Sequence, residues 1–332
     1  MFKGKKILIT GGTGSLGYAL TRRLLELGAE TIRIYSRNEE KQVSMESNFN
    51  DSRLRFFVGD IRDLPRLIRA LEDTDIVFHA AALKHVPVIE YNPFEAIKTN
   101  VMGSQNVIDA CLHEDVEAAI CIGTDKSVSP LNTYGATKLL MEKLFVTANN
   151  YLNPERHKTR FIAVRYGNVL GSSGSVVPKF IKQIMSKEKI TITDPNMTRF
   201  NITMNQALEL IIRATRKGIG GEVFIPKLKA YKLGDLKDVI VESLNAEDNT
   251  EIISVRRGEK YHESLISGDE IRNTYEDDDD YILIEGTDET SVKNRGLRRT
   301  TLKDRYSSDM VELIPKDQLK QILSNENIIS VN

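Results

Sequence analysis

The sequence predicts an α/β protein built on a doubly wound parallel sheet, with a smaller mixed C-terminal lobe. Two observations carry this prediction. Short apolar strands alternate with amphipathic helices over the first half of the chain, beginning with the strand Lys6–Thr10 and the helix Tyr18–Leu27. Polar or glycine-rich segments follow the strands, and the ligand site of such a sheet lies beyond the strand C-termini.

Composition limits the kinds of partner that we expect. The chain has 332 residues, a formal net charge of −1 and two cysteines, Cys111 and Cys121, which both lie in apolar segments and are expected in the core. The charge suggests no nucleic-acid or anionic membrane partner. We find no long uncharged apolar run and no signal-peptide pattern, so we expect a soluble, cytoplasmic protein.

We divide the chain into three parts. Residues 1–165 are the predicted dinucleotide-binding domain, and a strand near 222–225 returns to it. Residues 166–285 form the substrate lobe. Residues 286–332 are a polar, partly basic tail that either wraps a neighbouring subunit or lies loosely, with a short helix at Pro315–Leu323.

The turn after the first strand predicts a Rossmann dinucleotide site. Gly11 permits a tight turn, Gly14 a close approach of the pyrophosphate, and Gly17 close packing of the helix on the sheet. The cofactor-binding residues predicted in this turn are Gly11, Thr13, Gly14, Ser15, Leu16 and Gly17.

The end of the second strand, Thr31–Tyr35, favours NADP over NAD. An acidic residue there would bind a free ribose 2′-hydroxyl, but the chain has Ser36 and Arg37, which suit a 2′-phosphate. Asn38 and Lys41 complete this predicted group. The alternative is that Arg37 only opens the next helix, with its side chain in water.

Two further strand ends extend the predicted cofactor site. Asp60 and Ile61 follow the strand Arg53–Gly59, where Asp60 either accepts from the adenine amino group or caps the next helix. Ala80 and Ala81 follow the strand Asp75–His79 and let the cofactor approach the backbone. Lys84 comes next and is expected near the nicotinamide and the substrate, unless it is an ordinary surface residue.

The segment after the strand Ala118–Ile122 carries the candidate catalytic residues. Thr124, Asp125 and Lys126 come directly after this strand. Tyr134 and Lys138 are four residues apart at the start of the predicted helix Gly135–Asn149, so they share a face. An ammonium beside the phenol is expected to lower the tyrosine pKa and make it a usable base. The alternatives are two unrelated helix residues and, for Asp125 and Lys126, a loop salt bridge.

The second lobe begins after the buried strand Thr159–Arg165. A glycine- and serine-rich loop follows, and we predict a hairpin-like segment over Thr191–Phe200, helices at Asn201–Lys217 and Lys232–Leu244, and a strand at Ile252–Arg256. An ordinary surface ion pair is the alternative role for each charged residue here. Val169 is predicted to bind the cofactor, together with Tyr134 and Lys138. The residues predicted to bind the sugar nucleotide are Lys84, Asn168, Ser173, Val177, Lys179, Arg199, Arg256 and Glu259.

These motifs together resemble the extended short-chain dehydrogenase/reductase superfamily, and within it the C5-inverting UDP-N-acetylglucosamine 4,6-dehydratases of the pseudaminic acid type. The superfamily match is TGGTGSLG at Thr10–Gly17 with Tyr134 and Lys138. The narrower match covers roughly residues 5–265 and consists of YSRNE from Tyr35, AALKHVP from Ala81, TDK from Thr124, RYGNVLGSSGSVVP from Arg165, MTRF from Met197 and RRGEK from Arg256.

The resemblance implies a reaction in which C4 is oxidised, water is lost across C5 and C6, and hydride returns to C6. It implies that Tyr134, helped by Thr124, is the base at O4, and that Lys126 takes the C5 proton, provided that its pKa is lowered. Asp125 would protonate the leaving C6 hydroxyl, provided that its pKa is raised. Arg256 would meet phosphate and Glu259 the ribose. NADP would be recycled internally, and relatives often form dimers or hexamers.

The chain departs from this group at Gly123, where a serine is common, and at Arg257, where the family motif has proline. The alternatives are a C5-retaining dehydratase, a UDP-hexose 4-epimerase, for which Asp125 and Lys126 would be superfluous, and a non-catalytic NADP-binding sensor. We predict no metal site, and we expect the acidic run Glu276–Asp280 to be a solvated turn.

Overall fold

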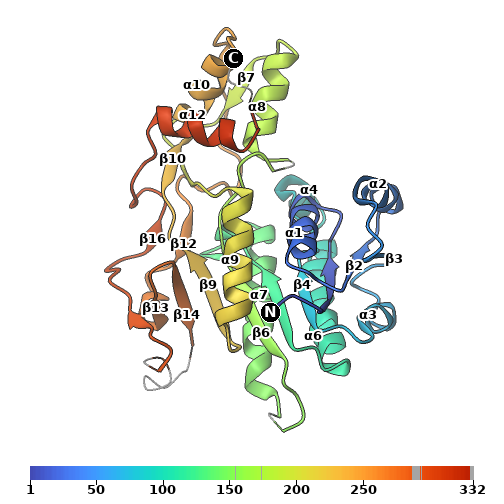
Figure 1. Ribbon diagram of the computed structural model, residues 1–332. Helices are drawn as coiled ribbons and strands as arrows, with labels where there is room; N and C mark the ends of the chain where they lie inside the picture. The colour runs from blue at the N-terminus through green and yellow to red at the C-terminus, as the bar shows by residue number, and fades with distance from the viewer. Residues whose placement is uncertain (154, 173, 286–291, 293, 330–332) are drawn as a thin grey trace.

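The computed structural model describes residues 1–332 except 154, 173, 286–291, 293 and 330–332. A ten-stranded sheet runs through the molecule in the order β15-β13-β14-β9-β6-β5-β4-β1-β2-β3. The strands from β3 to β9 in this order are parallel, and β14, β13 and β15 continue the sheet in antiparallel fashion (Figure 1). The predicted doubly wound α/β fold is therefore confirmed. The strands of the sheet are β1 (Lys6–Thr10), β2 (Thr31–Ser36), β3 (Leu54–Val58), β4 (Ile76–His79), β5 (Ala118–Ile122), β6 (Arg160–Val164), β9 (Glu222–Pro226), β13 (Thr274–Glu276), β14 (Asp280–Ile284) and β15 (Arg298–Arg299).

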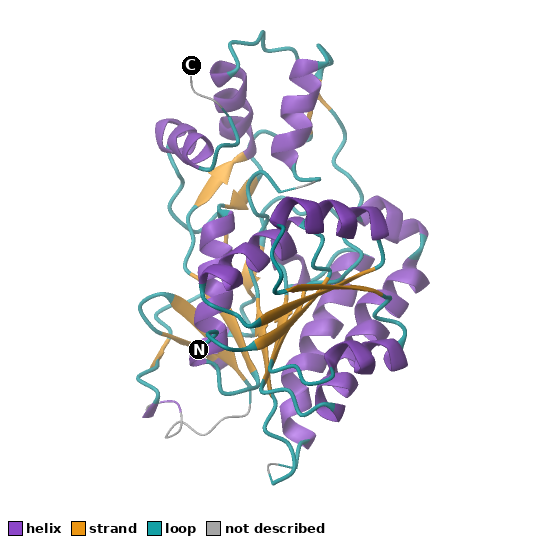
Figure 2. Ribbon diagram, turned by 45° about the vertical axis from the view of Figure 1, so that its right-hand side comes forward, coloured by secondary structure: helices purple, strands orange, loops and turns teal. Residues whose placement is uncertain are grey.

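Helices cover both faces of the sheet (Figure 2). Buried side chains of one group of helices form one apolar core, and those of the other group form a second core on the opposite face. The first group consists of α1 (Ser15–Glu26), α2 (Glu39–Phe49) and α9 (Met204–Lys217); the second consists of α3 (Leu64–Leu71), α6 (Gly103–His113) and α7 (Thr133–Ala148). Preceding α6 are α4 (Val86–Tyr91), α5 (Pro93–Ala96) and the π-helical turn η1 (Ile97–Met102).

Side-chain caps determine where several of these helices begin. Asn38 accepts from the Lys41 backbone N–H at the start of α2, and Asn132 accepts from the Gly135 N–H at the start of α7. Thr203 and Gln206 form a reciprocal capping box at the start of α9. The cap at Asn132 fixes the first turn of the helix that carries Tyr134.

A smaller lobe stands beyond the C-terminal edge of the sheet, at the top of Figure 1. Its helices α8 (Val176–Met185), α10 (Leu233–Ser243) and α12 (Lys316–Asn325) enclose a third apolar core. Two short sheets join it: β7 (Ile190–Ile192) pairs with β11 (Thr250–Ile252), and β8 (Thr198–Phe200) pairs with β10 (Ala230–Lys232). The predicted hairpin over Thr191–Phe200 is therefore wrong, because its two strands pair with different partners. The predicted strand Ile252–Arg256 is also wrong beyond Ile252, where the chain turns into a loop.

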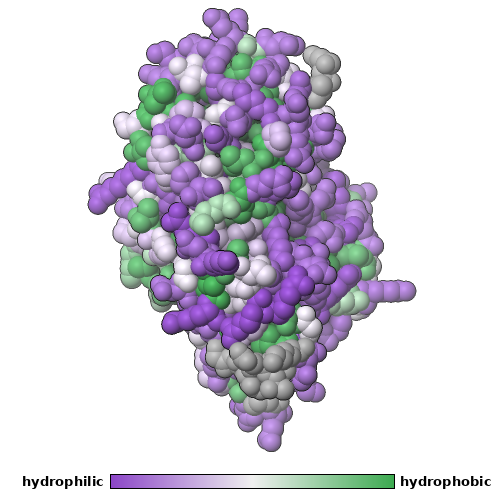
Figure 3. Space-filling model, turned by 90° about the vertical axis from the view of Figure 1, so that its left-hand side faces the viewer, coloured by the Kyte–Doolittle hydropathy of each residue, from purple (hydrophilic) through white to green (hydrophobic). Residues whose placement is uncertain are grey.

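The described part of the tail is folded onto the rest of the chain, so the expectation of a loose tail is wrong for these residues. β15 pairs with β13, and β16 (Tyr306–Ser307) pairs with β12 (Ser264–Ile266). α12 packs against α10. The face that carries these strands is mostly hydrophilic, with separate apolar spots (Figure 3).

The acidic run is only partly the solvated turn that we predicted. Asp278 and Asp279 are exposed, but Glu276 and Asp280 are buried. Asp280 accepts two hydrogen bonds from Arg213, and Glu276 pairs with Lys227 at 3.0 Å. Among the described residues, no cluster of three or more His, Cys, Asp or Glu side chains is arranged to hold a metal ion. In the same part of the chain, no helix combines the length and the apolarity that crossing a bilayer requires.

Candidate active site

A cleft of about 570 Å³ lies at the C-terminal ends of the parallel strands. It is lined by the turn after β1, the ends of β2 to β6 and the start of α7. Every residue that the sequence predicts to hold the cofactor lines this cleft, and so do Thr124 and Asn168. One cleft therefore joins the glycine turn to Thr124, Tyr134 and Lys138.

The glycine turn lies too close to its neighbours for larger residues. Gly11 has a φ of +68°, and a Cβ there would lie 2.8 Å from the Ala81 Cα. A Cβ at Gly17 would overlap the Gly12 carbonyl. These glycines let the N-terminus of α1 and the end of β4 lie close together, so that backbone atoms line this part of the cleft.

The end of the cleft beside β2 and β3 is basic and contains one ion-paired carboxylate, that of Asp60. Asp60 accepts from the Arg62 backbone N–H at 3.0 Å and from the Arg62 guanidinium, and it lies 3.8 Å from Arg37 Nη1. Although burial opposes this, the bonds to Arg62 hold the pKa of Asp60 below its usual value. Asp60 is not the cap of α3, because Asp63 has that role. The Arg37 side chain is 54% exposed at the rim of the cleft.

The candidate catalytic loop leaves the end of β5. Gly123 and Asp125 donate from their backbone N–H groups to Val164 and Tyr166, which lie on and just after β6. A turn of 3₁₀ helix, η2 (Asp125–Ser127), follows, and Ser127 Oγ donates to the Thr124 carbonyl at 2.6 Å. The loop is therefore fixed at both ends, and Thr124 and Asp125 are buried at its base.

Close packing accounts for the glycine at position 123, where the dehydratases that the sequence resembles commonly have a serine. A Cβ on this residue would lie 2.5 Å from the Val164 carbonyl oxygen and 3.3 Å from a Glu142 carboxylate oxygen. The hydrogen bond from the Gly123 N–H to that same carbonyl is 2.7 Å long. A serine at this position requires the two segments to move apart.

We expected Lys138 to lower the pKa of Tyr134, and this prediction is wrong. Lys138 Nζ donates to the Ile122 carbonyl at 2.6 Å and lies 3.3 Å from Met141 Sδ. Burial raises the pKa of Tyr134, and the cation that opposes this effect is Lys126. The Tyr134 hydroxyl also shares a hydrogen bond with Thr124. Burial lowers the pKa of Lys138 to about 8.

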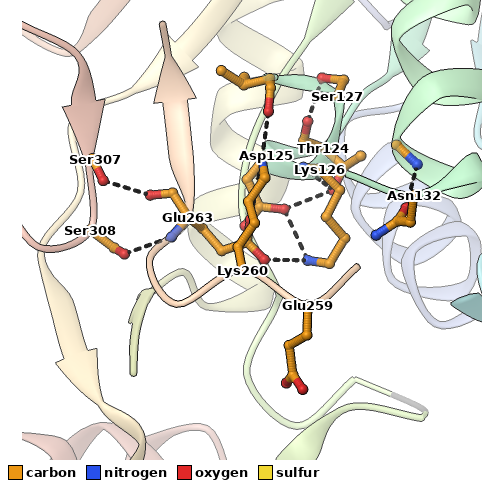
Figure 4. Close-up of polar contacts among 12 residues, drawn as sticks. Thr124, Asp125, Lys126, Ser127, Asn132, Glu259, Lys260, Glu263, Ser307 and Ser308 are labelled. Carbon is orange, nitrogen blue, oxygen red and sulfur yellow. Dashed lines mark hydrogen bonds and ion pairs between the residues drawn. The ribbon is translucent and has the colours of Figure 1, made fainter. Parts of the chain in front are cut away.

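Lys126 lies between two carboxylates, and one of them was not predicted from the sequence (Figure 4). Its Nζ is 3.1 Å from Asp125 Oδ1, 3.5 Å from Glu263 Oε1 and 3.1 Å from Asn168 Oδ1. Glu263 precedes β12 and is buried. It lies just past the RRGEK motif, and no local pattern marks it, because its contact with Lys126 depends on how the small lobe folds back.

These carboxylates decide the charges in the site. Burial disfavours the ammonium of Lys126, but Asp125 and Glu263 outweigh it and raise the Lys126 pKa. The lowered pKa that we expected for this lysine is therefore not found. Burial raises the pKa of Asp125, as expected for an acid.

Only some of the residues predicted to bind the substrate lie close together. Lys179 on α8 donates from Nζ to the Thr191 carbonyl at 3.3 Å. Burial and the Arg256 charge lower the Lys179 pKa, and the Glu259 charge opposes them. Arg199 is buried, donates to the carbonyls of Lys260 and Tyr261, and lies 3.7 Å from Glu259. Its guanidinium thus supports the loop that carries Arg256. Val177 is fully buried in the small-lobe core, and Ser173 lies outside the described residues.

Comparison with known proteins gives a consistent set of relatives. The profile of the family described as "Polysaccharide biosynthesis protein" matches residues 7–285. A UDP-N-acetylglucosamine 4,6-dehydratase (inverting) of Campylobacter jejuni is 47% identical over 319 residues, which cover 93% of this chain and 94% of the relative. A UDP-glucose 4-epimerase of Rickettsia bellii is 39% identical over 333 residues, which cover 98% and 97%. The X-ray structure of Pen from Bacillus thuringiensis superimposes with a TM-score of 0.92 at 38% identity and covers 99% of both chains.

Proposed function

The chain belongs to the polysaccharide biosynthesis protein family, and we propose that it is an inverting UDP-N-acetylglucosamine 4,6-dehydratase. The product is UDP-2-acetamido-2,6-dideoxy-β-L-arabino-hex-4-ulose, which makes the enzyme a hydro-lyase. The observation that carries this proposal is the position of Asp125 and Lys126 beside Tyr134 at the end of β5. Removing water across C5 and C6 requires an acid and a second base, and these two residues provide them. The relative from Campylobacter jejuni supports the substrate and the stereochemistry.

The cleft fits a nicotinamide dinucleotide. The close-packed glycine turn at the start of α1 offers backbone N–H groups and a helix N-terminus to a pyrophosphate. At the far end Ser36 stands where an NAD site has an acid, and Arg37 and Lys41 line the rim, so we propose NADP. When bound, this cofactor supplies hydride transfer to and from the sugar carbons and is regenerated within each cycle.

We assign to Tyr134 the removal of the proton from the sugar O4. Its hydroxyl hydrogen-bonds Thr124 and lies within the field of the Lys126 ammonium, which favours the phenolate. Lys138 serves a different purpose: its Nζ is tied to the end of β5 and fixes the first turns of α7 against that strand. With a pKa of about 8, Lys138 also places a positive charge at the cleft below this pH.

The elimination is assigned to Asp125 and Lys126. A proton passing from the Lys126 ammonium to Asp125 Oδ1, over 3.1 Å, leaves an amine that can take the C5 proton. The same transfer leaves a carboxylic acid that can protonate the departing C6 hydroxyl. Because burial already raises the Asp125 pKa, this carboxyl is suited to hold that proton.

A second candidate is a UDP-glucose 4-epimerase, and the relative from Rickettsia bellii favours it. The two reactions share the oxidation at C4 and differ at C5 and C6. Proton NMR of the purified protein with UDP-N-acetylglucosamine distinguishes them. We expect a new methyl signal, whereas interconversion of C4 epimers with an intact hydroxymethyl group would replace the dehydratase by the epimerase.

We also propose a homo-oligomer formed through one apolar face. Val88, Tyr91, Phe94 and Met102 are exposed on α4, α5 and η1, which contact α7, where Leu140 is exposed. A patch of this kind on adjoining elements is typical of a surface that another copy covers. Light scattering should show a multimer for the native protein and a smaller species after Tyr91→Glu. A native monomer would overturn this part of the proposal.

A further inference from the structure

Glu263 is a buried carboxylate with an unusual set of neighbours. Its Oε1 lies 3.5 Å from Lys126 Nζ, and its Oε2 lies 3.8 Å from Lys260 Nζ. Oε2 is fully buried and has no hydrogen-bond partner among the residues that the structure describes. A carboxylate oxygen that accepts no hydrogen bond is costly to bury, so its surroundings must compensate for it in another way.

Backbone contacts hold Glu263 in place from a part of the chain far from the catalytic loop. Its N–H donates to Ser308 Oγ at 3.0 Å, and its carbonyl accepts from Ser307 Oγ at 3.3 Å (Figure 4). The same carbonyl accepts from the Ser308 N–H at 2.8 Å. Its neighbour Lys260 donates to the Val128 carbonyl, and Asn132 Nδ2 donates to the Gly258 carbonyl at 2.9 Å. The segment from Gly258 to Glu263 is therefore fastened directly onto the catalytic loop.

Nearby positive charges compensate for the burial of the Glu263 carboxylate. Burial opposes its ionisation, but the charges of Lys126, Arg199 and Lys260 outweigh burial and lower its pKa. Burial raises the pKa of Asp125, and the Glu263 charge adds to this effect, although Lys126 and the Thr124 hydroxyl oppose it. The titratable or charged groups that face the Lys126–Glu263 pair are Asp125, Tyr134, Arg199, Tyr231 and Lys260.

We propose that Glu263 is a positioning residue that keeps Lys126 protonated between turnovers and leaves Asp125 as the carboxyl that gains and loses the proton. Two carboxylates share one ammonium, and the one with more cations around it retains the negative charge. Glu263 thus sets how readily the Lys126 ammonium passes its proton to Asp125 and leaves the amine that takes the C5 proton. This role rests on the proposed dehydratase function, but the charge arrangement can be measured without turnover.

The sign of the effect follows from the charges. A carboxylate beside an ammonium raises the ammonium pKa, so Glu263→Gln, which keeps the shape and removes the charge, lowers the Lys126 pKa. From the usual effect of an adjacent charge we expect a shift of about 1 unit or more. The acid limb of the pH profile of kcat should move to lower pH by a similar amount, while KM changes little.

The test uses the full chain with ¹³C-labelled lysine side chains, titrated by NMR without substrate. The Lys126 signal is assigned by its loss in Lys126→Met. It should titrate at lower pH in Glu263→Gln than in the native protein, and Glu263→Asp should restore much of the difference. Asp269→Asn is the matched control, because this exposed carboxylate follows Glu263 just beyond β12. An unchanged Lys126 titration in Glu263→Gln would overturn the proposal.

The outcome separates this inference from the function on which it rests. If Lys126 shifts as expected and no methyl product forms, the charge arrangement stands and the dehydratase assignment fails. If the product forms and neither the titration nor the kcat profile moves, the dehydratase assignment stands and the role of Glu263 fails. Thermal unfolding of each variant confirms that the compared proteins are folded.

Discussion

Replacing Arg165 by methionine should destabilise the protein far more than an exposed substitution does. Arg165 follows β6 and is fully buried. Its Nε donates to Glu142 at 3.0 Å, and its Nη1 and Nη2 lie 3.1 and 2.9 Å from the Glu270 oxygens. Nη1 also donates to the Leu265 carbonyl at 2.9 Å. The guanidinium therefore joins α7, the end of β6 and β12, which are the elements around Tyr134 and Glu263.

The magnitude follows from the charge that the substitution leaves behind. Glu142 is buried and loses its cation, and removing one member of a buried ion pair costs about 3–5 kcal/mol. At about 2 °C per kcal/mol for a chain of this size, Tm should fall by roughly 6–10 °C. Lys229→Met is the control, because Lys229 and Glu312 are 46% and 66% exposed. Breaking such a pair costs less than about 1 kcal/mol.

The loss should also depend on pH in a defined direction. In the native protein Arg165 holds the pKa of Glu270 below its usual value in spite of burial, so Glu270 adds stability above about pH 4.3, the unfolded value. Without Arg165, burial raises that pKa, and Glu270 then costs stability over the same range. Urea unfolding should therefore show a larger loss near pH 7 than near pH 4. A loss below about 1 kcal/mol, or one that is equal at both pH values, would refute this reasoning.

Three further substitutions test the site. Tyr134→Phe should lower kcat by roughly 10²- to 10⁴-fold, as expected when a proton-transfer group is lost, while cofactor binding by calorimetry is retained; unchanged kcat would remove Tyr134 from the reaction. Asp125→Asn should slow both methyl formation and deuterium uptake at C5 in D2O, because Asp125 receives the Lys126 proton and then protonates the leaving C6 hydroxyl; an unchanged rate of deuterium uptake would argue against this proton transfer. Arg37→Ser should weaken NADP binding about tenfold or more and leave NAD nearly unchanged, because only NADP carries the 2′-phosphate; equal losses for both would contradict the proposed preference.

The sequence predicts those parts of the site that depend on local order. Glycines after β1 and polar residues after β5 come to the same sheet edge in any parallel α/β fold, so Gly11 and Thr124 could be placed in one cleft from the sequence alone. The helix start at Tyr134 was also predictable, because the strand, turn and helix follow one another directly.

The remaining features depend on contacts between distant segments. The Lys126 pKa could not be predicted, because Glu263 comes from 137 residues further along the chain, and its position requires the pairing of β12 with β16. The antiparallel strands β13 and β14 escaped prediction because their connecting turn lies within an acidic run. The burial of Asp280 depends on Arg213 of α9, and no local pattern connects these two residues.

The central claim is an elimination across C5 and C6 with hydride carried from C4 to C6 of the same sugar. It is tested most directly with UDP-N-acetylglucosamine that carries deuterium at C4, incubated with the native protein without added cofactor. We predict a product with one deuterium in its new methyl group, identified by NMR and mass spectrometry. A methyl group without deuterium would contradict internal return of the hydride, and deuterium that remains at C4 of an epimerised sugar with an intact hydroxymethyl group would contradict dehydration.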